Sequence, residues 1–429
     1  MFFERPKSGE RAVLVHIKLN SESEPEDPRE FEELVISAGG DPVEFLTGSR
    51  QSPSAKFFVG SGKLEEISAA VKSADAQLVI FNHNLSPSQE RNIEAELKCR
   101  VLDRTGLILD IFAQRARTHE GKLQVELAQL QHLSSRLVRG WTHLERQRGG
   151  IGNRGPGETQ LESDRRLVRE RIKAIKQRLD KVRKQRDQGR RARTKSEIPT
   201  VSLVGYTNAG KSTLFNKLTS ADVYVADQLF ATLDPTMRRL DLAELGPVVF
   251  ADTVGFISHL PHRLVDAFRA TLEEAASSNL LMHVVDASAV DRSVNIVRVN
   301  EVLKEINAHD LPSLMIYNKI DLLDDVQPHI ERNEEGIPIA VWVSALAGEG
   351  LALLLQAVVE CLPNKIVHQH LQLQPSQGAF RAALYSQKAV LSEQSAESGV
   401  INLEVKLAES DFLRLLKNSG LKLEDLVTL

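Results

Sequence analysis

The chain has 429 residues, 54 of them Lys or Arg and 58 Asp or Glu, which leaves a net charge of −4. This length is enough for about three domains that each bury a core, and its two cysteines, Cys99 and Cys361, are too few for a disulfide framework or a cysteine-based metal site. No stretch approaches the roughly 18 apolar residues of a membrane span, and the first residues lack the apolar segment of a signal peptide, so we expect a cytoplasmic protein. We also expect a monomer.

Residues 1–115 are predicted to form a small α/β domain. Apolar runs alternate with segments of helical periodicity, an order that is typical of a parallel sheet with helices on its faces. The expected strands are residues 13–17, 77–81 and 100–102, and the expected helices are residues 27–37, 64–73, 86–97 and a segment from 105 onward.

Residues 60–63, Gly-Ser-Gly-Lys, share residue types with a phosphate-binding loop. They lack the four-residue spacing that such a loop has between its first glycine and its Gly-Lys pair. A turn with a surface lysine is the favoured interpretation, and a second nucleotide site, for ATP, is the alternative.

Residues 116–195 are predicted to form a helical hairpin, which we call the arm. Two apolar stripes with spacings of three and four residues indicate two long helices that pair antiparallel. The stripes consist of Leu123, Leu127, Leu130, Leu133 and Leu137, and then of Leu161, Val168, Ile172, Ile175, Leu179 and Val182. Between them, residues 149–157 include five glycines, which favours a flexible, cationic tip that orders inside an RNA cavity. A plain linker between the helices is the alternative.

The arm is basic, although the whole chain is acidic. Residues 115–195 contain 23 Lys or Arg and 9 Asp or Glu, a net charge of +14, so the rest of the chain carries −18. A basic block in an acidic chain favours a polyanionic partner, and the excess of arginine suits bidentate contacts with phosphates. Because Trp141 is almost alone as an aromatic residue here, sequence-specific base recognition is not indicated. A solvated helix face is the alternative to RNA binding.

Residues 196–365 are predicted to form a P-loop domain, a mostly parallel sheet with helices on both faces. Residues 205–213 read Gly-Tyr-Thr-Asn-Ala-Gly-Lys-Ser-Thr, between an apolar strand over 201–204 and a helix over 213–218. This context is the one in which glycines let successive backbone amides approach phosphates. Lys211 is placed to reach the β- and γ-phosphates, and the Ser212 hydroxyl to bind Mg²⁺.

Two further motifs complete the predicted phosphate and metal site. A strand over 248–252 ends at Asp252, whose carboxylate can hold the water shell of Mg²⁺, and Gly255 can present its N–H to the γ-phosphate. Within residues 230–236, Thr232 is the candidate switch threonine, whose hydroxyl reaches Mg²⁺ only when a γ-phosphate is present. A plain turn before Pro235 is the alternative for this segment.

The base is predicted to be guanine. After a strand over 314–317, Asp321 can accept hydrogen bonds from N1 and the 2-amino group of guanine, and adenine offers neither donor. A third strand, over 341–346, brings Ser344 and Ala345 to the guanine O6.

Two positions near the phosphates predict how hydrolysis is controlled. Phe256 follows Gly255 at the position where many GTPases carry a water-orienting glutamine, so intrinsic hydrolysis should be slow and an external partner should complete the site. Asn208 is where some GTPases hold K⁺ beside the β- and γ-phosphates, and a simple turn-former is the alternative.

The predicted site is therefore made of five short segments. Lys211, Thr232 and Gly255 are predicted to act in hydrolysis, and Ser212 and Thr232 to bind Mg²⁺. The nucleotide-contacting set is Gly205, Tyr206, Thr207, Asn208, Ala209, Gly210, Lys211, Ser212, Thr213, Phe230, Ala231, Thr232, Leu233, Asp234, Asp252, Thr253, Val254, Gly255, Asn318, Lys319, Ile320, Asp321, Ser344, Ala345 and Leu346.

Residues 370–429 are predicted to form a small C-terminal α+β domain without visible chemistry, and a protein-docking surface is expected of it. Residues 369–377 are interpreted as a linker. The expected strands are residues 380–385, 389–391 and 400–407, and a helix is expected over 410–418.

The combination of motifs resembles the HflX family of ribosome-associated GTPases, within the Obg–HflX-like P-loop GTPases. The likeness covers roughly residues 10–365 and rests on the P-loop and on four further segments. These are Phe-Ala-Thr-Leu-Asp from 230, Asp-Thr-Val-Gly-Phe from 252, Gly-Pro-Gly-Glu-Thr-Gln-Leu-Glu from 155 and the block 102–117.

The resemblance implies GTP hydrolysis, binding to the large ribosomal subunit through residues 115–195, a cytoplasmic location in part at ribosomes, and dissociation or rescue of stalled ribosomes under stress. One alternative is a GTP-regulated RNA-binding switch, RNA chaperone or ribosome assembly factor with little turnover. Another adds ATP-dependent RNA remodelling by the N-terminal domain.

Overall fold

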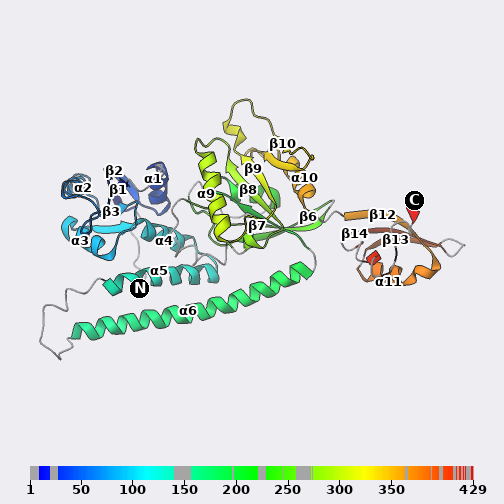
Figure 1. Ribbon diagram of the computed structural model, residues 1–429, viewed down its shortest axis with the longest axis horizontal. Helices are drawn as coiled ribbons and strands as arrows, with labels where there is room; N and C mark the ends of the chain where they lie inside the picture. Colours follow the sequence, from blue (N-terminus) through cyan, green and yellow to red (C-terminus); the bar gives the residue numbers. More distant parts are fainter. Residues whose placement is uncertain are drawn as a thin grey trace.

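The structure is a computed structural model that describes residues 9–19, 28–139, 156–195, 198–220, 229–243, 245–257, 272, 274–362, 366–387, 389–395, 400–408, 412, 415–416, 419, 421 and 427–428. Three β-sheets follow one another along the chain. In Figure 1 they lie in a row, with the helices α5 (His119–Arg139) and α6 (Pro156–Lys195) below the first two. The predicted α/β class, with a parallel P-loop sheet and a small C-terminal domain, is confirmed.

The N-terminal sheet is parallel, as predicted, with the strand order β2-β1-β3-β4. Because successive strand residues point to opposite faces, β1 and β3 contribute to two cores, one under α1 and α4 and one under α2 and α3. The strands are β1 (Arg11–Leu19), β2 (Asp41–Arg50), β3 (Leu78–Phe81) and β4 (Arg100–Asp103). The helices are α1 (Pro28–Ser37), α2 (Ser61–Ser73), α3 (Pro87–Leu97) and α4 (Arg104–Arg115).

Strand β2 was not among the expected strands. It is an edge strand in which Leu46 is the one buried residue of ten, so it lacks the apolar run that indicates a buried strand. The Gly-Ser-Gly-Lys segment begins α2, and the Lys63 ammonium pairs with Glu66 at 2.8 Å. Residues 61–63 are therefore the first turn of a helix, and the Lys63 side chain is half-buried, at 19% exposure.

The arm contains the expected antiparallel helices. Leu123 and Leu127 of α5 pack with Ile175 of α6, and the ion pairs Arg171–Glu126 and Arg186–Glu120 run in antiparallel order. The predicted stripe does not hold along its whole length, because Leu133 is 46% exposed. The prediction for the glycine-rich tip lies mostly outside the described residues, since residues 140–155 fall in a gap and α6 begins at Pro156.

The P-loop domain has a seven-stranded sheet in the order β10-β11-β9-β8-β5-β7-β6. Its inner pairs are parallel, and the β6/β7 and β10/β11 pairs at the two edges are antiparallel. The strands are β5 (Thr200–Val204), β6 (Thr236–Leu242), β7 (Gly246–Asp252), β8 (Leu280–Asp286), β9 (Ser313–Asn318), β10 (His329–Arg332) and β11 (Pro338–Trp342). The helices include α7 (Lys211–Thr219), α9 (Arg292–Glu305) and α10 (Leu351–Cys361). The strand expected over 341–346 is thus found at Pro338–Trp342, and residues 343–346 form the loop that follows it.

The C-terminal sheet corrects two predictions. Residues 380–385 are not a strand but part of α11 (Gly378–Ser386), in which Phe380 and Leu384 are buried one helical turn apart. Residues 369–377 are not a linker, because most of them belong to β12 (Ile366–Leu373), where Leu371 and Leu373 alternate with polar residues. The sheet order is β13-β14-β12-β15, with β13 (Val390–Ser395), β14 (Ile401–Ala408) and β15 (Val427–Thr428). In the expected helix over 410–418, Phe412, Leu415 and Leu416 are helical and buried.

The N-terminal and P-loop domains share one buried core. This cluster joins side chains of α1 and α4 to residues that follow β7 and to the predicted switch segment. Among its members are Phe112, Leu229, Phe230, Leu233 and Phe256. The nucleotide site is therefore built against the N-terminal domain.

Candidate nucleotide site

The loop over 205–210 connects the buried strand β5 to the N-terminus of α7. Gly205 has φ +147°, and a Cβ there would lie 2.2 Å from the carbonyl oxygen of Val284. Gly210 has φ +88°, and its Cβ would lie 2.2 Å from Nδ2 of Asn318. Only glycine fits both the conformation and the space at these two positions, so the loop holds its backbone amides at the start of the helix.

Lys211 lies inside this loop, with 6% of its surface exposed. Its ammonium donates to the carbonyl oxygens of Gly205 at 3.0 Å and Tyr206 at 2.7 Å. Burial lowers the pKa of Lys211 to about 8, and the negative charge of Asp252 opposes that shift. A bound phosphate chain would place negative charge beside this ammonium. That charge would raise the pKa of Lys211 again and favour the protonated form.

Ser212, Thr232 and Asp252 converge from three separate segments. The Ser212 hydroxyl lies 2.7 Å from the Thr232 hydroxyl and donates to Oδ2 of Asp252 at 2.7 Å, and Thr232 donates to the same oxygen at 3.0 Å. Oδ1 of Asp252 is buried and has no hydrogen-bond partner among the described residues. Burial raises the pKa of Asp252, while the Ser212 hydrogen bond and the Lys211 charge act in the opposite direction.

This cluster fits a magnesium ion. One carboxylate and two hydroxyls are hard oxygen donors, and Mg²⁺ in nucleotide sites takes few protein ligands besides phosphates and water. The orphaned Asp252 Oδ1 offers an acceptor for a metal-bound water. In the described part of the chain, no group of three or more His, Cys, Asp or Glu side chains forms a rival metal site.

The segments predicted to contact guanine meet behind the loop. Asn318 donates through Nδ2 to the carbonyl of Ala209 at 2.9 Å and accepts from the Ala345 N–H at 2.9 Å. Oδ1 of Asp321 accepts from the Ser344 hydroxyl at 2.5 Å. Asp321 itself is exposed. Its carboxylate can therefore discriminate guanine from adenine only when a bound base shields it from water.

Lys319 and Leu346 complete the surroundings of this base site. The Lys319 ammonium pairs with Asp286 at the end of β8, at 2.7 Å, and Leu346 is 73% exposed. Asp286 is not among the residues that the sequence analysis assigns to the site. Its position could have been inferred, because residues 280–286 form a buried apolar strand that ends in this carboxylate.

The residue after Gly255 is a packing residue. Phe256 is 3% exposed in the shared core, its N–H donates to the carbonyl of Gly205, and its carbonyl accepts from the Thr207 N–H at 2.7 Å. A Cβ at Gly255 would lie 2.9 Å from Cγ2 of Thr207 and 3.0 Å from Nζ of Lys211. Gly255 therefore has no room for a side chain beside Lys211, and the buried Phe256 offers no polar group to orient water.

A small cavity of about 60 Å³ marks the place expected for phosphates and metal. It is lined by Thr207, Asn208, Gly210, Lys211, Ser212, Thr213, Phe230, Ala231, Thr232, Thr253 and Gly255. Other members of the predicted set point elsewhere. Leu233 and Val254 belong to the shared core, and the Tyr206 hydroxyl donates to Glu30 of α1. The carboxylate of Asp234, another predicted nucleotide contact, accepts hydrogen bonds from Arg117 and Thr118.

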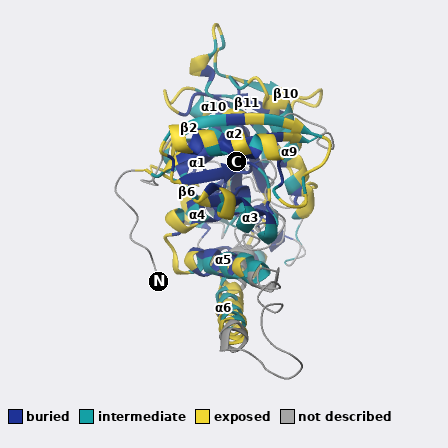
Figure 2. Ribbon diagram, turned by 90° about the vertical axis from the view of Figure 1, so that its left-hand side faces the viewer, coloured by how far each residue is buried: buried dark blue, intermediate teal, exposed yellow. Residues whose placement is uncertain are grey.

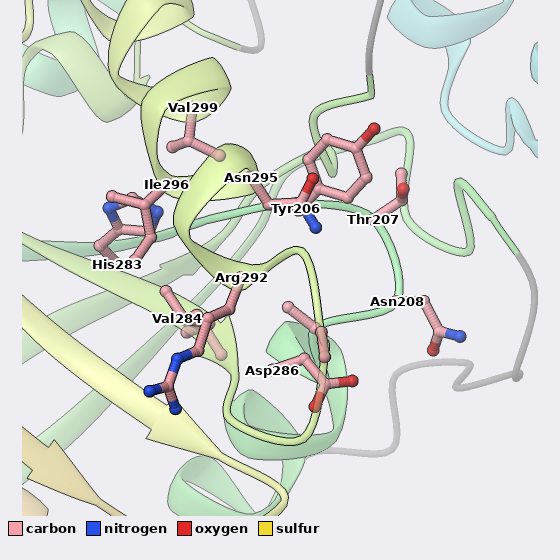
Figure 3. Close-up of a pocket in the computed structure, with 13 residues that line it drawn as sticks. Tyr206, Thr207, Asn208, His283, Val284, Asp286, Arg292, Asn295, Ile296 and Val299 are labelled. Atoms are coloured by element: carbon pink, nitrogen blue, oxygen red, sulfur yellow. The ribbon is translucent and has the colours of Figure 1, made fainter. Parts of the chain in front are cut away.

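A larger cavity of about 100 Å³ lies on the other side of the loop, between the end of β8 and α9. Figure 3 shows His283, Asp286 and Arg292 around it, together with loop residues Tyr206 to Asn208. Burial, and then the Lys211 charge, lower the pKa of His283 to about 4, so this ring is neutral at physiological pH. The smaller cavity is the candidate phosphate site, because Lys211, Ser212 and Thr232 line it.

Four family models match the chain in succession. They are described as GTP-binding GTPase N-terminal (residues 26–113), GTP-binding GTPase middle region (115–193), 50S ribosome-binding GTPase (200–319) and HflX C-terminal domain (329–424). The likeness was expected to end near residue 365. The C-terminal match extends it to residue 424.

Two curated relatives match over 99% and 83% of the chain. GTPase HflX of Escherichia coli (strain K12) is 57% identical over 425 residues, which cover 99% of this chain and all of that protein. GTPase HflX of Caldanaerobacter subterraneus subsp. tengcongensis is 47% identical, covering 83% of this chain and 81% of that protein. Among solved structures, the crystal structure of SsGBP in complex with GDP covers 81% of this chain and 97% of its own, at 26% identity and a TM-score of 0.47.

Proposed function

Because this chain belongs to the HflX family of GTPases, we propose that it binds the large ribosomal subunit and uses GTP to dissociate, rescue or remodel stalled ribosomes under stress. It is a GTP hydrolase, and its central domain is of the ribosome-binding GTPase family. We place it in the cytoplasm, in part at ribosomes, as a monomer. In its described part, no helix is long and apolar enough to cross a membrane.

One observation carries the proposal: a long, exposed, basic helix, α6, ends a few residues before β5, the strand that leads into the P-loop. In Figure 2, α6 lies below α5, and its turns are coloured mainly as exposed or intermediate. Its apolar contact with α5 involves Ile172, Ile175 and Leu179. Its exposed cations include Arg166, Arg169, Arg171, Lys173, Lys176, Arg178, Lys181, Arg183 and Lys184. Such a row suits the phosphates of ribosomal RNA, and the scarcity of aromatic residues favours recognition of backbone rather than bases.

In this proposal, separate groups of site residues bind the phosphates, the metal ion and the guanine base. Lys211 and the loop amides hold the β- and γ-phosphates, and the Gly255 N–H meets the γ-phosphate. Ser212 and Thr232 would hold Mg²⁺, Asp252 would accept hydrogen bonds from its water shell, and the ion would neutralise charge that develops on the phosphates. Asp321, Asn318 and the Ser344–Ala345 backbone recognise guanine.

Hydrolysis by the free protein should be slow. Phe256 is packed in the core, so nothing at that position orients the attacking water. Turnover should therefore rise strongly, by about 10-fold or more, when large ribosomal subunits complete the site. Measuring GTP turnover with and without purified large subunits tests this. Unchanged turnover would favour the RNA-binding switch, and ATP turnover that survives Lys211→Ala would favour a remodelling activity of the N-terminal domain.

Potassium is a second proposed cation. Asn208 has φ +60° and lines the cavity beside Lys211, where its amide could hold K⁺ against the β- and γ-phosphates. Replacing K⁺ with Na⁺ should then slow hydrolysis several-fold, and Asn208→Ala should remove the difference between the two salts. Equal rates of the unaltered protein in both salts would assign Asn208 to the turn alone.

A further inference from the structure

The predicted switch segment, residues 230–236, contacts the first residues of the arm through Asp234. Oδ2 of Asp234 accepts from the backbone N–H groups of Arg117 and Thr118, each at 2.9 Å, and Oδ1 accepts from the Thr118 hydroxyl at 2.5 Å. The same hydroxyl accepts from the Gly121 N–H at 2.9 Å, so Thr118 caps α5. A Cβ at Gly121 would lie 2.1 Å from Oδ1 of Asp234. The helix terminus and the carboxylate are therefore in close contact.

The other end of the segment is attached to the N-terminal domain as well. Phe230 is 2% exposed, and its ring packs edge-on against Phe112 of α4 with 4.6 Å between centroids. The Leu229 N–H donates to the Ser37 hydroxyl at the end of α1, at 3.0 Å. Phe230 has φ +56°, a conformation that a bulky residue adopts only when its surroundings impose it.

Thr232 lies between these two attachments. Two residues before it, a ring is held by α4, and two residues after it, a carboxylate is held by the start of α5. A segment this short with both ends fixed retains little conformational entropy. The Thr232 hydroxyl lies 2.7 Å from that of Ser212 and 3.0 Å from Oδ2 of Asp252, so little further entropy is lost when a γ-phosphate and Mg²⁺ bring it onto the metal.

The phosphate loop has a matching attachment to the same region. The Tyr206 hydroxyl donates to Glu30 of α1, and Glu30 pairs at 2.9 Å with Arg104, the first residue of α4. A displacement of the junction between α4 and α5 would therefore act on both the loop and the switch.

We infer that the α4–α5 junction is a positioning element for GTP hydrolysis, in which Asp234 and Phe112 hold Thr232 in place at the metal site. Arm and nucleotide are thereby coupled, because the contact that orders Thr232 is made with the first turn of the arm. The inference needs only the GTPase activity. It stands whether or not the arm's partner is the ribosome.

The test uses the free protein and compares Asp234→Ala with Asp241→Ala, an exposed carboxylate on β6 that pairs only locally with Arg239. With Asp234→Ala, kcat should fall by about 10-fold to 100-fold. Affinity for a non-hydrolysable GTP analogue with Mg²⁺ should fall several-fold, while affinity for GDP should stay within about 2-fold of wild type, because Thr232 meets the metal only beside a γ-phosphate. Asp241→Ala should match wild type in all three.

Thr118→Ala removes the hydroxyl that donates to Asp234, and this variant replaces Asp234→Ala in the test if Asp234→Ala does not fold. In Thr118→Ala, affinity for the analogue should again fall more than affinity for GDP, but by a smaller factor than in Asp234→Ala. The double variant should lose no more of its selectivity for the analogue over GDP than Asp234→Ala alone, since the Thr118 hydroxyl acts on Thr232 only through Asp234. The inference is overturned if Asp234→Ala behaves like Asp241→Ala, if GDP affinity falls as much as analogue affinity, or if the two losses add.

Discussion

Replacing Asp321 with asparagine should shift the nucleotide preference of this GTPase from GTP towards XTP. An ionised carboxylate accepts from both N1–H and the 2-amino group of guanine, and hydrogen bonds to a charged group contribute about 1.5–3 kcal/mol each. In Asp321→Asn the Ser344 hydroxyl can still donate to Oδ1, as it does to the carboxylate at 2.5 Å. The new NH₂ is then free to face the keto oxygen that xanthine carries in place of the 2-amino group.

The expected loss of GTP affinity is on the order of 100-fold, with a gain for XTP. Titrating both nucleotides against the wild type, Asp321→Asn and the control Asp324→Asn measures it. Asp324 is exposed and three residues further along, so its variant carries the same change of charge. Unchanged GTP affinity in Asp321→Asn would remove Asp321 from the guanine site.

Removing charge from α6 should weaken ribosome binding without affecting the nucleotide site. Arg169, Lys173 and Lys176 are exposed and lie on one face of the helix, beside the apolar stripe that packs on α5. If each meets an RNA phosphate, their joint replacement by Ala removes three contacts. Each contact contributes roughly 0.7–0.9 to the slope of log affinity against log salt. The slope should therefore become shallower by about 2 to 3.

The experiment measures affinity for large subunits over a series of salt concentrations, along with ribosome-stimulated GTP turnover and GTP affinity of the free protein. Stimulation should fall sharply in the triple variant, and GTP affinity should stay at the wild-type value. The control replaces Arg238, Arg239 and Lys304, three exposed cations of the P-loop domain, and so removes the same charge. Equal losses of affinity for large subunits in both variants would mean that binding depends on net charge and not on the position of these cations on α6.

Several elements were predictable because their causes are local. The strand, loop and helix around Lys211 follow from a few adjacent residues, in which glycine is required at φ +147° and +88°. The parallel N-terminal sheet follows from alternating apolar runs. The C-terminal errors have a local cause too, since a short run such as residues 380–385 fits a strand or a buried helix equally well. Burial of Phe380 and Leu384 one turn apart settled it as a helix.

The sequence by itself determined the chemistry of this protein: a P-loop, a carboxylate at the end of β7, a predicted guanine site and a basic arm. Each depends on residue types at fixed short spacing. Only the tertiary structure decided how these parts are connected. Asp234 and Thr118 are 116 residues apart, and Tyr206 and Glu30 are 176 apart. Such contacts depend on how two domains pack around one core, and no spacing along the chain encodes that. For this reason the sequence did not predict that the Asp234 carboxylate accepts hydrogen bonds from Arg117 and Thr118 at the start of the arm.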